Sequence, residues 1–432
     1  MSPMSRGRKS KKQKKAQKSR KRATTKVIRP APGDGSPVRE SEQLSASREP
    51  PEWFGPSIAR VLGQVDAIVS AASPRELEQV TAELTGAELH RALREERTGL
   101  WFEWWFDELA GAAAEQVRAE SDAGTWQAPW RLLHGLASVG SPALRGIAVQ
   151  AAGDARKALS PEQLAGQPDW LGLCPDAAVT GGLWVMRDDY GTRFAVLAEY
   201  GYPGGVDPSV FLFDIDACGL ITLASAGVFD SVDEAVTAWR EGKGDAADGA
   251  QPEPVAGYDQ LTCLVYCDIG SEFFHGNEPR PFTDNFFRAN RRAHDIAVVL
   301  ERQGQRWPQT RNLYQDLAIE PAVKAFSAWY ARRHESEPHE EAVRWLAGDW
   351  LEGKLPGTEH AVSPHRVADL LQYMDDDWLP GEPVTIAARA LLPEWVRWNG
   401  AEAGIRAGLI ERSAAVAAGE PWNTDECPAF MF

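Results

Sequence analysis

The sequence is short of cysteine and of long apolar runs, and both shortages exclude classes of protein. Five cysteines in 432 residues are too few, and odd in number, for a disulfide framework, so we expect reduced thiols. No stretch approaches the roughly 18 consecutive apolar residues of a membrane-spanning helix, and no apolar core of a signal peptide follows the charged start. We therefore expect a cytoplasmic protein with no membrane partner.

Motifs of common enzymes are also missing. There is no Gly-x-Ser-x-Gly elbow, no Gly-x-Gly-x-x-Gly turn and no kinase signature. Gly348–Leu355 follows the P-loop pattern until its last position, where leucine replaces the hydroxyl residue that would meet Mg²⁺. We expect a helix end there, with Gly353 as its cap. The sequence predicts no catalytic residue and no cofactor.

Histidine and cysteine spacing gives no recognisable metal site. Cys263 and Cys267 are four residues apart on an expected strand, which separates them by about 13 Å, too far for one zinc ion. In a helix the two could converge, but no second pair of cysteines or histidines lies nearby at a suitable spacing. His334 and His339 are five apart, as are His360 and His365, and this spacing does not suit one helix face. We therefore predict no metal site.

Paired carboxylates offer a weaker hint of chemistry. Asp214 and Asp216 lie on one face of an expected strand, and Asp375–Asp377 is an acidic triplet. Either could contribute to an Mg²⁺ site with ligands from elsewhere. Because no third carboxylate or lysine is placed with them, we favour strand-end turn residues for the pair and a solvated loop for the triplet.

Charge is divided sharply along the chain. The first 29 residues carry 13 lysines and arginines and no acid, whereas the rest holds 33 basic against 62 acidic residues. A basic arm on an acidic body is typical of tails that contact nucleic acid or another polyanion. A solubilising disordered leader is the alternative. The predicted nucleic-acid-binding residues are Arg6, Arg8, Lys9, Lys11, Lys12, Lys14, Lys15, Lys18, Arg20, Lys21, Arg22, Lys26 and Arg29.

Composition and periodicity divide the chain into four parts. Residues 1–50 are expected to be a disordered basic tail and linker, and residues 51–168 a helical bundle. Residues 169–280 are expected to form an α+β region with an antiparallel sheet, and residues 281–432 a C-terminal helical region. The fold class is therefore α+β: a small antiparallel β-sheet between two helical regions, preceded by the tail.

Several helix boundaries are marked by capping residues. Ser73 before Pro74, with Glu76 three residues on, predicts a helix start, and Ser363 before Pro364 predicts another. Pro393 is expected to start a further helix that Gly400 ends. Among the 17 tryptophans, the cluster Trp101, Trp104 and Trp105 has helical spacing, so we expect it in the core rather than in an aromatic binding platform.

Alternating apolar residues predict the strands. Arg193–Tyr200 and Val210–Asp216 alternate on either side of a Gly-Tyr-Pro-Gly-Gly segment, which predicts a hairpin with positive φ at Gly204 or Gly205. Leu220–Ala226 is expected as a third strand, and Trp184–Arg187 and Leu261–Ile269 as extensions of the sheet. A capping box at residues 231–234 opens a helix that Gly242 is expected to end, before an acidic loop at residues 242–257.

Two segments together resemble a known set of sequences. They are residues 193–216 and, further on, Ser363–Pro364 with Asp377–Pro380 and Leu392–Trp398. In this order they resemble a family of uncharacterised bacterial proteins of high-GC genomes, with similarity over residues 55–415. Members often carry basic residues after the Trp-Leu-Pro, where this chain has Gly381 and Glu382. The family has no assigned function, so the resemblance transfers no site residue.

Three functional hypotheses remain open. The first is a non-enzymatic binding or adaptor protein that contacts nucleic acid non-specifically through its basic tail. The second is an enzyme with a site near the 200–216 hairpin, and the third is a protein–protein scaffold. Copurifying nucleic acid favours the first, converging acids in a deep pocket favour the second, and a large exposed apolar patch favours the third.

Overall fold

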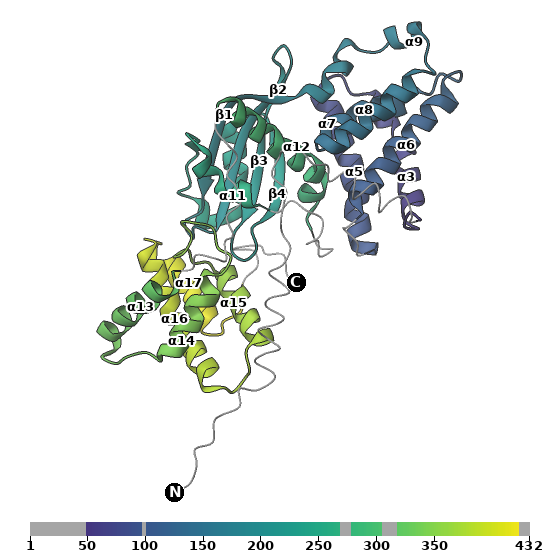
Figure 1. The fold of residues 1–432 in the computed structure, drawn as a ribbon. Coiled ribbons are helices and arrows are strands. Elements are labelled where there is room, and N and C mark those ends of the chain that lie inside the picture. Colours follow the sequence, from purple (N-terminus) through teal and green to yellow (C-terminus); the bar gives the residue numbers. More distant parts are fainter. Residues whose placement is uncertain (1–48, 97–100, 268–277, 305–317, 423–432) are drawn as a thin grey trace. The chain divides into compact units, whose positions relative to one another are not determined.

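The computed structural model describes residues 49–96, 101–267, 278–304 and 318–422 (Figure 1). All of them belong to one compact unit, Glu49–Phe432. The expected tail and its basic residues, Arg6 to Arg29, lie outside the described residues. No helix in the described ranges is long and apolar enough to cross a membrane. The fold is α+β, as the sequence predicts.

Helices form the first third of the unit. Ser73 Oγ accepts from the backbone N–H of Glu76 at 3.2 Å, so the predicted cap forms at the start of the helix that begins at Pro74. Trp105 is fully buried, whereas Trp101 and Trp104 are only half-buried. The core interpretation of the cluster therefore holds fully for Trp105 alone. The helices are α3 (Phe54–Leu62), α4 (Asp66–Val69), α5 (Pro74–Glu96), α6 (Phe102–Glu120), α7 (Gln127–Val139), α8 (Pro142–Arg156) and α9 (Pro161–Ala165), followed by the 3₁₀ helix η1 (Asp169–Asp176).

A five-stranded antiparallel sheet follows, in the order β4-β3-β2-β1-β5. The predicted hairpin joins β2 and β3, with Tyr202 paired to Val206 and both Gly204 and Gly205 at positive φ. β5 pairs only with Trp184 and Val185 of β1. The strands are β1 (Ala178–Arg187), β2 (Arg193–Tyr202), β3 (Val206–Asp216), β4 (Thr222–Phe229) and β5 (Glu253–Pro254).

Strand alternation places the sheet between two apolar layers. Val196, Ala198 and Phe213 belong to the core shared with the N-terminal helices and with α12 (Arg280–Arg302). Ala195 and Leu197, one residue out of phase, pack with α10 (Val232–Lys243) on the other face. The helix α12 lies against the sheet in Figure 1. Period-two patterning thus buries both faces.

The C-terminal helices share a separate core. Ser363 Oγ accepts from the backbone N–H of Arg366 at 3.1 Å and caps α15, as predicted. Figure 1 shows these helices gathered as one green-to-yellow group. They are α13 (Ile319–His334), α14 (Glu340–Leu351), α15 (Pro364–Asp377), α16 (Pro383–Glu402) and α17 (Ala407–Ala417).

Three sequence-based expectations are wrong for described residues between positions 242 and 402. The described part of Leu261–Ile269 is not a strand; it holds a 3₁₀ turn and the short helix α11 (Thr262–Tyr266), since a short apolar run does not distinguish the two. Pro393 lies inside α16, which begins at Pro383 and continues past Gly400. Residues 242–257 do not form one loop; they contain the end of α10, a 3₁₀ turn with buried alanines, and β5.

Candidate functional site

The end of β3 carries two buried carboxylates beside a buried arginine. The antiparallel register pairs Arg193 of β2 with Asp216 of β3. Arg193 Nη1 donates to Asp216 Oδ2 at 2.7 Å, and Nη2 donates to Asp214 Oδ2 at 3.0 Å. All three side chains are at most 4% exposed. One guanidinium therefore joins both carboxylates, in the fork geometry that suits arginine.

Asp214 has two further donors from α10. Lys243 Nζ lies 2.7 Å from Oδ2, and Trp239 Nε1 donates to Oδ1 at 3.0 Å. Burial alone would raise the pKa of Asp214, but Arg193 and Lys243 hold it below its ordinary value. These contacts correct the expectation that Asp214 and Asp216 are strand-end turn residues. Asp214 is an internal ion-pair partner, which leaves it little capacity to bind Mg²⁺.

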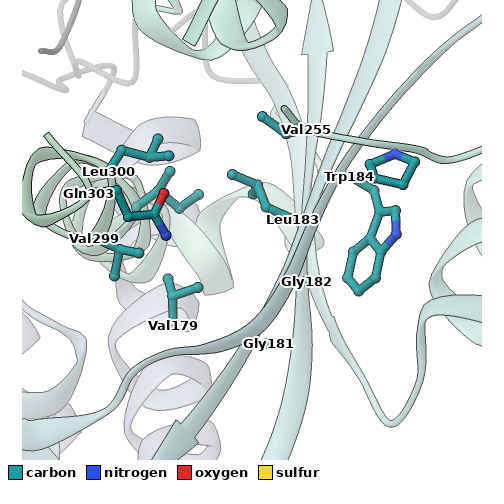
Figure 2. Close-up of a pocket in the computed structure, with 11 residues that line it drawn as sticks. Val179, Gly181, Gly182, Leu183, Trp184, Val255, Val299, Leu300 and Gln303 are labelled. Carbon is teal, nitrogen blue, oxygen red and sulfur yellow. The ribbon is translucent and has the colours of Figure 1, made fainter. Parts of the chain in front are cut away.

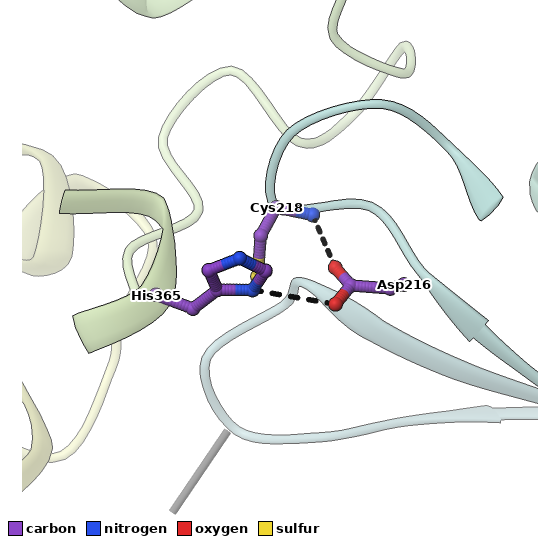
Figure 3. A group of neighbouring side chains, drawn as sticks. All are labelled: Asp216, Cys218 and His365. Carbon is purple, nitrogen blue, oxygen red and sulfur yellow. Dashed lines mark hydrogen bonds and ion pairs between the residues drawn. The ribbon is translucent and has the colours of Figure 1, made fainter. Parts of the chain in front are cut away.

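Asp216 links the sheet to a cysteine and a histidine (Figure 3). Its Oδ1 accepts from the backbone N–H of Cys218 at 2.8 Å, and its Oδ2 lies 3.3 Å from Nδ1 of His365. The ligand-type atoms of Asp216, Cys218 and His365 all lie within 4.8 Å of one another. The thiol of Cys218 is 3.1 Å from the hydroxyl of Ser363, which caps α15. The start of α15 therefore brings His365 to the end of β3.

The ring of His365 contacts two carboxylates and one aromatic ring. Its Nε2 lies 3.1 Å from Asp369 Oδ1, one helical turn further along α15, and the ring of Trp422 stacks on it at 5.0 Å. Burial alone would lower the pKa of His365, but Cys218, Asp216 and Asp369 raise it well above its ordinary value. The buried Nδ1 is ion-paired with Asp216. The ring is fixed in place with Nδ1 toward the cluster.

Two further cations lie near Cys218. Lys354 Nζ donates to the backbone carbonyls of Cys218 and Gly219, and burial lowers its pKa to about 8. Arg366 donates to three backbone carbonyls, and burial lowers its pKa to about 9. A thiol, an imidazole and a carboxylate in such a setting can provide a nucleophile with its base, or three donors to a transition metal.

The hairpin proposed as an enzyme site forms a second buried network. Tyr200 OH donates to the backbone carbonyl of Arg292 at 2.8 Å, and Tyr202 OH donates to Glu78 Oε2 at 2.7 Å. Arg292 Nη2 donates to both oxygens of Glu78 at 2.7 Å. These groups satisfy one another inside the protein, so they join α5, β2 and α12.

A cavity of about 420 Å³ lies beside the outer half of the sheet (Figure 2). Val299 and Leu300 of α12, with Gln303 at the C-terminal cap of this helix, line one side. Val179 and Leu183 of β1 point toward them in Figure 2, whereas Trp184 lies on the other side of the strand. Among the described residues that line it, none is charged, so this part of the chain gives the cavity space for an apolar group but no acid or base.

Sequence reasoning missed the group at the end of β3. Of the cysteine and histidine pairs considered for zinc, only His365 belongs to this group. Cys263 and Cys267 are buried at α11, whose helical backbone removes the separation of about 13 Å expected for a strand, and His360 contacts Asn399. Asp375 pairs with Arg389 at the surface. Lys354, taken as part of a failed P-loop, instead lies beside Cys218. The one available signal was Asp216 two residues before Cys218, because both then lie where a strand ends.

Comparisons with known proteins add no relative. A scan against family models, a search of curated proteins and a search of solved structures each found no match. The resemblance to a bacterial family therefore stays a prediction. What is established is an α+β fold whose sheet, at the end of β3, meets the first turn of α15 through a buried Asp–Cys–His group.

Proposed function

We propose that the chain is a cytoplasmic, non-enzymatic binding or adaptor protein that contacts nucleic acid through Arg6–Arg29. The observation that carries the proposal is the separation of charge: 13 basic and no acidic residues in the first 29, against 33 basic and 62 acidic in the rest. Polyphosphates bind dense positive charge with release of counterions, and they are repelled by a strongly acidic surface.

The described surface supports this assignment because its arginines are repeatedly neutralised. Arg145 pairs with Asp176 at 2.8 Å, and Arg397 pairs with Glu411 at 2.9 Å. The same holds on other elements, for Arg60, Arg75, Arg280, Arg344, Arg389, Arg406 and Arg412. An arginine already paired with a carboxylate offers little to a phosphate, so these arginines add little to the affinity that the proposal assigns to the tail.

A salt titration tests the proposal. Binding of the full chain to mixed-sequence DNA and RNA is measured by fluorescence anisotropy between about 50 and 200 mM salt, where a tail that contacts several phosphates loses affinity steeply. The logarithmic slope should be about −0.7 to −0.9 for each phosphate neutralised, with little sequence preference. A peptide of residues 1–29 should bind more tightly than the full chain at low salt, because the acidic body repels the ligand.

Two variants of the full chain serve as matched controls. Glutamine at all 13 basic positions of Arg6–Arg29 should abolish binding, whereas a tail with the same residues in shuffled order should bind as the natural chain does. Undiminished binding by the glutamine variant would overturn the proposal. Loss of binding in the shuffled variant would contradict its non-specific, electrostatic character. If the natural chain itself does not bind, the scaffold hypothesis takes its place.

A further inference from the structure

We propose that Asp216, Cys218 and His365 form a binding site for one zinc ion or a similar divalent transition metal. The three side chains come from the end of β3 and the first turn of α15, and they are 3%, 0% and 6% exposed. Their donor atoms lie within 4.8 Å of one another. A carboxylate, a thiolate and an imidazole are ordinary zinc ligands. The site is independent of the tail and of its proposed function.

The geometry needs only a small adjustment to hold a metal. Asp216 Oδ2 and His365 Nδ1 are 3.3 Å apart. Two ligands of a tetrahedral zinc ion, each bonded at about 2.0–2.1 Å, are separated by about 3.3 Å, so these two atoms already have the required spacing. The sulfur of Cys218 lies within 4.8 Å of both atoms. A thiolate and an oxygen or nitrogen ligand of one zinc ion are about 3.6 Å apart, so the sulfur has to approach by at most about 1.2 Å.

The surroundings of His365 match those of a metal-binding histidine. Such a ring usually bonds a carboxylate through its remote nitrogen, which fixes the ring and makes the other nitrogen a better ligand. Nε2 of His365 lies 3.1 Å from Asp369 Oδ1. Nδ1 is buried and lies 3.3 Å from Asp216 Oδ2. This nitrogen therefore faces another of the three proposed ligands.

Charge balance permits a dication although Arg193, Lys354 and Arg366 are near. Metal binding requires a thiolate at Cys218 and a neutral ring at His365, so it displaces one proton from each. Two positive charges enter and two protons leave, and the total charge of the cluster does not change. The neighbouring cations therefore see the same net charge with metal as with protons. Arg193 can keep its contact with Asp216.

The donor set also selects among metals. Thiolate and imidazole ligands favour zinc and cobalt over magnesium and calcium, which prefer oxygen donors. The described residues supply three protein ligands, the number found in zinc sites whose fourth position is held by water.

Cobalt titration of the full chain tests the site. The purified protein is treated with a chelator, kept reduced and titrated with Co²⁺. We expect one Co²⁺ per chain, with a near-ultraviolet thiolate-to-cobalt band and the strong visible bands of a tetrahedral ion, all removed by Zn²⁺. Cys218→Ser should lose the thiolate band. Asp369→Asn should keep the stoichiometry and weaken affinity about 10- to 100-fold, because it removes the partner of Nε2.

Matched variants separate this site from other thiols and histidines. Cys263→Ser, buried in α11, and His360→Gln, which loses contacts with Asn399 and with the ring of Trp398, should bind cobalt as the natural chain does. A variant in which serine replaces Cys174, Cys263, Cys267 and Cys427 leaves Cys218 as the only cysteine and should keep the band. This last result does not require Cys218→Ser to fold.

Two outcomes would overturn the proposal. One is a natural chain that shows no thiolate-to-cobalt band, in which case the cluster is a network of ion pairs. The other is a band that disappears when the four other cysteines are replaced in a variant that melts as the natural chain does, since the thiolate then comes from elsewhere.

Discussion

Neighbouring tryptophans of one helix have different energetic roles. Trp105 is fully buried and its ring stacks on Trp53 at a centroid distance of 6.4 Å. Trp104 is half-buried, and its Nε1 reaches Glu108 at 3.1 Å on the exposed side of α6. We predict that Trp105→Ala lowers the free energy of unfolding by about 3–5 kcal/mol, because it removes a large buried ring and leaves a cavity.

Trp104→Ala is the matched control and should cost less than half as much, since part of that ring already faces solvent. Urea denaturation followed by circular dichroism measures both. Equal losses of unfolding free energy in the two variants would show that the difference in solvent exposure between the two rings does not determine their contributions to stability.

At the scale of elements, the β2–β3 hairpin depends on two glycines. Gly204 and Gly205 have φ of +85° and +74°, and Gly205 N–H donates to the carbonyl of Tyr202 at 3.1 Å. We predict that alanine at either position destabilises the protein by about 1–2 kcal/mol, because a Cβ is strained in left-handed backbone. Thermal unfolding of both variants measures the effect.

Gly146, exposed in α8 with open space around its Cα, is the opposite case. Gly146→Ala should stabilise by about 0.5–1 kcal/mol, since alanine loses less backbone freedom in a helix. A stabilised Gly204→Ala or a destabilised Gly146→Ala would contradict the conformational argument.

Local signals explain which elements were predictable from the sequence. Ser73 and Ser363 accept hydrogen bonds from the third helical residue, and such caps act within one turn of chain. In β2 and β3, alternate residues belong to the two different cores on either side of the sheet, which is the period-two signal that the sequence carries. By contrast, Pro393 starts no helix, because buried residues on both sides, among them Leu392 and Trp395, hold α16 together through tertiary packing. The helical structure of this segment depends on its burial against residues distant in sequence, which local sequence signals do not reveal.

At the scale of the whole molecule, the candidate metal site could not be predicted because its parts are distant in sequence. Cys218 and Ser363, whose side chains touch, are 145 residues apart. Asp216 precedes Cys218 by two residues, but neither residue type nor spacing indicates that the first turn of α15 meets them. Only the folded sheet and the C-terminal helices together bring His365 to Asp216. The excess of acidic residues after position 29 can be counted from the sequence. Which of these carboxylates form buried ion pairs with arginines can be known only from the structure.

The Glu78 network ties the N-terminal helices to the sheet and predicts how stability depends on pH. Glu78 of α5 accepts from Arg292 of α12, Tyr202 of β2 and Ser138 of α7. Burial alone would raise its pKa, but Arg292 and the nearby Arg288 hold the pKa of Glu78 below its ordinary value of 4.5. A carboxylate with a lowered pKa stabilises the folded state above its unfolded pKa, and this contribution is lost as pH falls through the folded value.

We therefore predict that Glu78→Gln lowers the free energy of unfolding by about 3–5 kcal/mol at neutral pH, because the buried guanidinium of Arg288 loses its paired carboxylate and that of Arg292 keeps only Asp295 among the described carboxylates. The difference between the natural chain and the variant should narrow as pH falls below about 4, since Glu78 then becomes protonated and resembles glutamine. Urea denaturation of both proteins across this range measures the difference. Other acidic residues titrate alike in both proteins, so their contributions cancel in the difference between the two free energies of unfolding. A difference that stays constant down to the lowest pH at which both fold would show that Glu78 contributes by shape and hydrogen bonding, and not by charge.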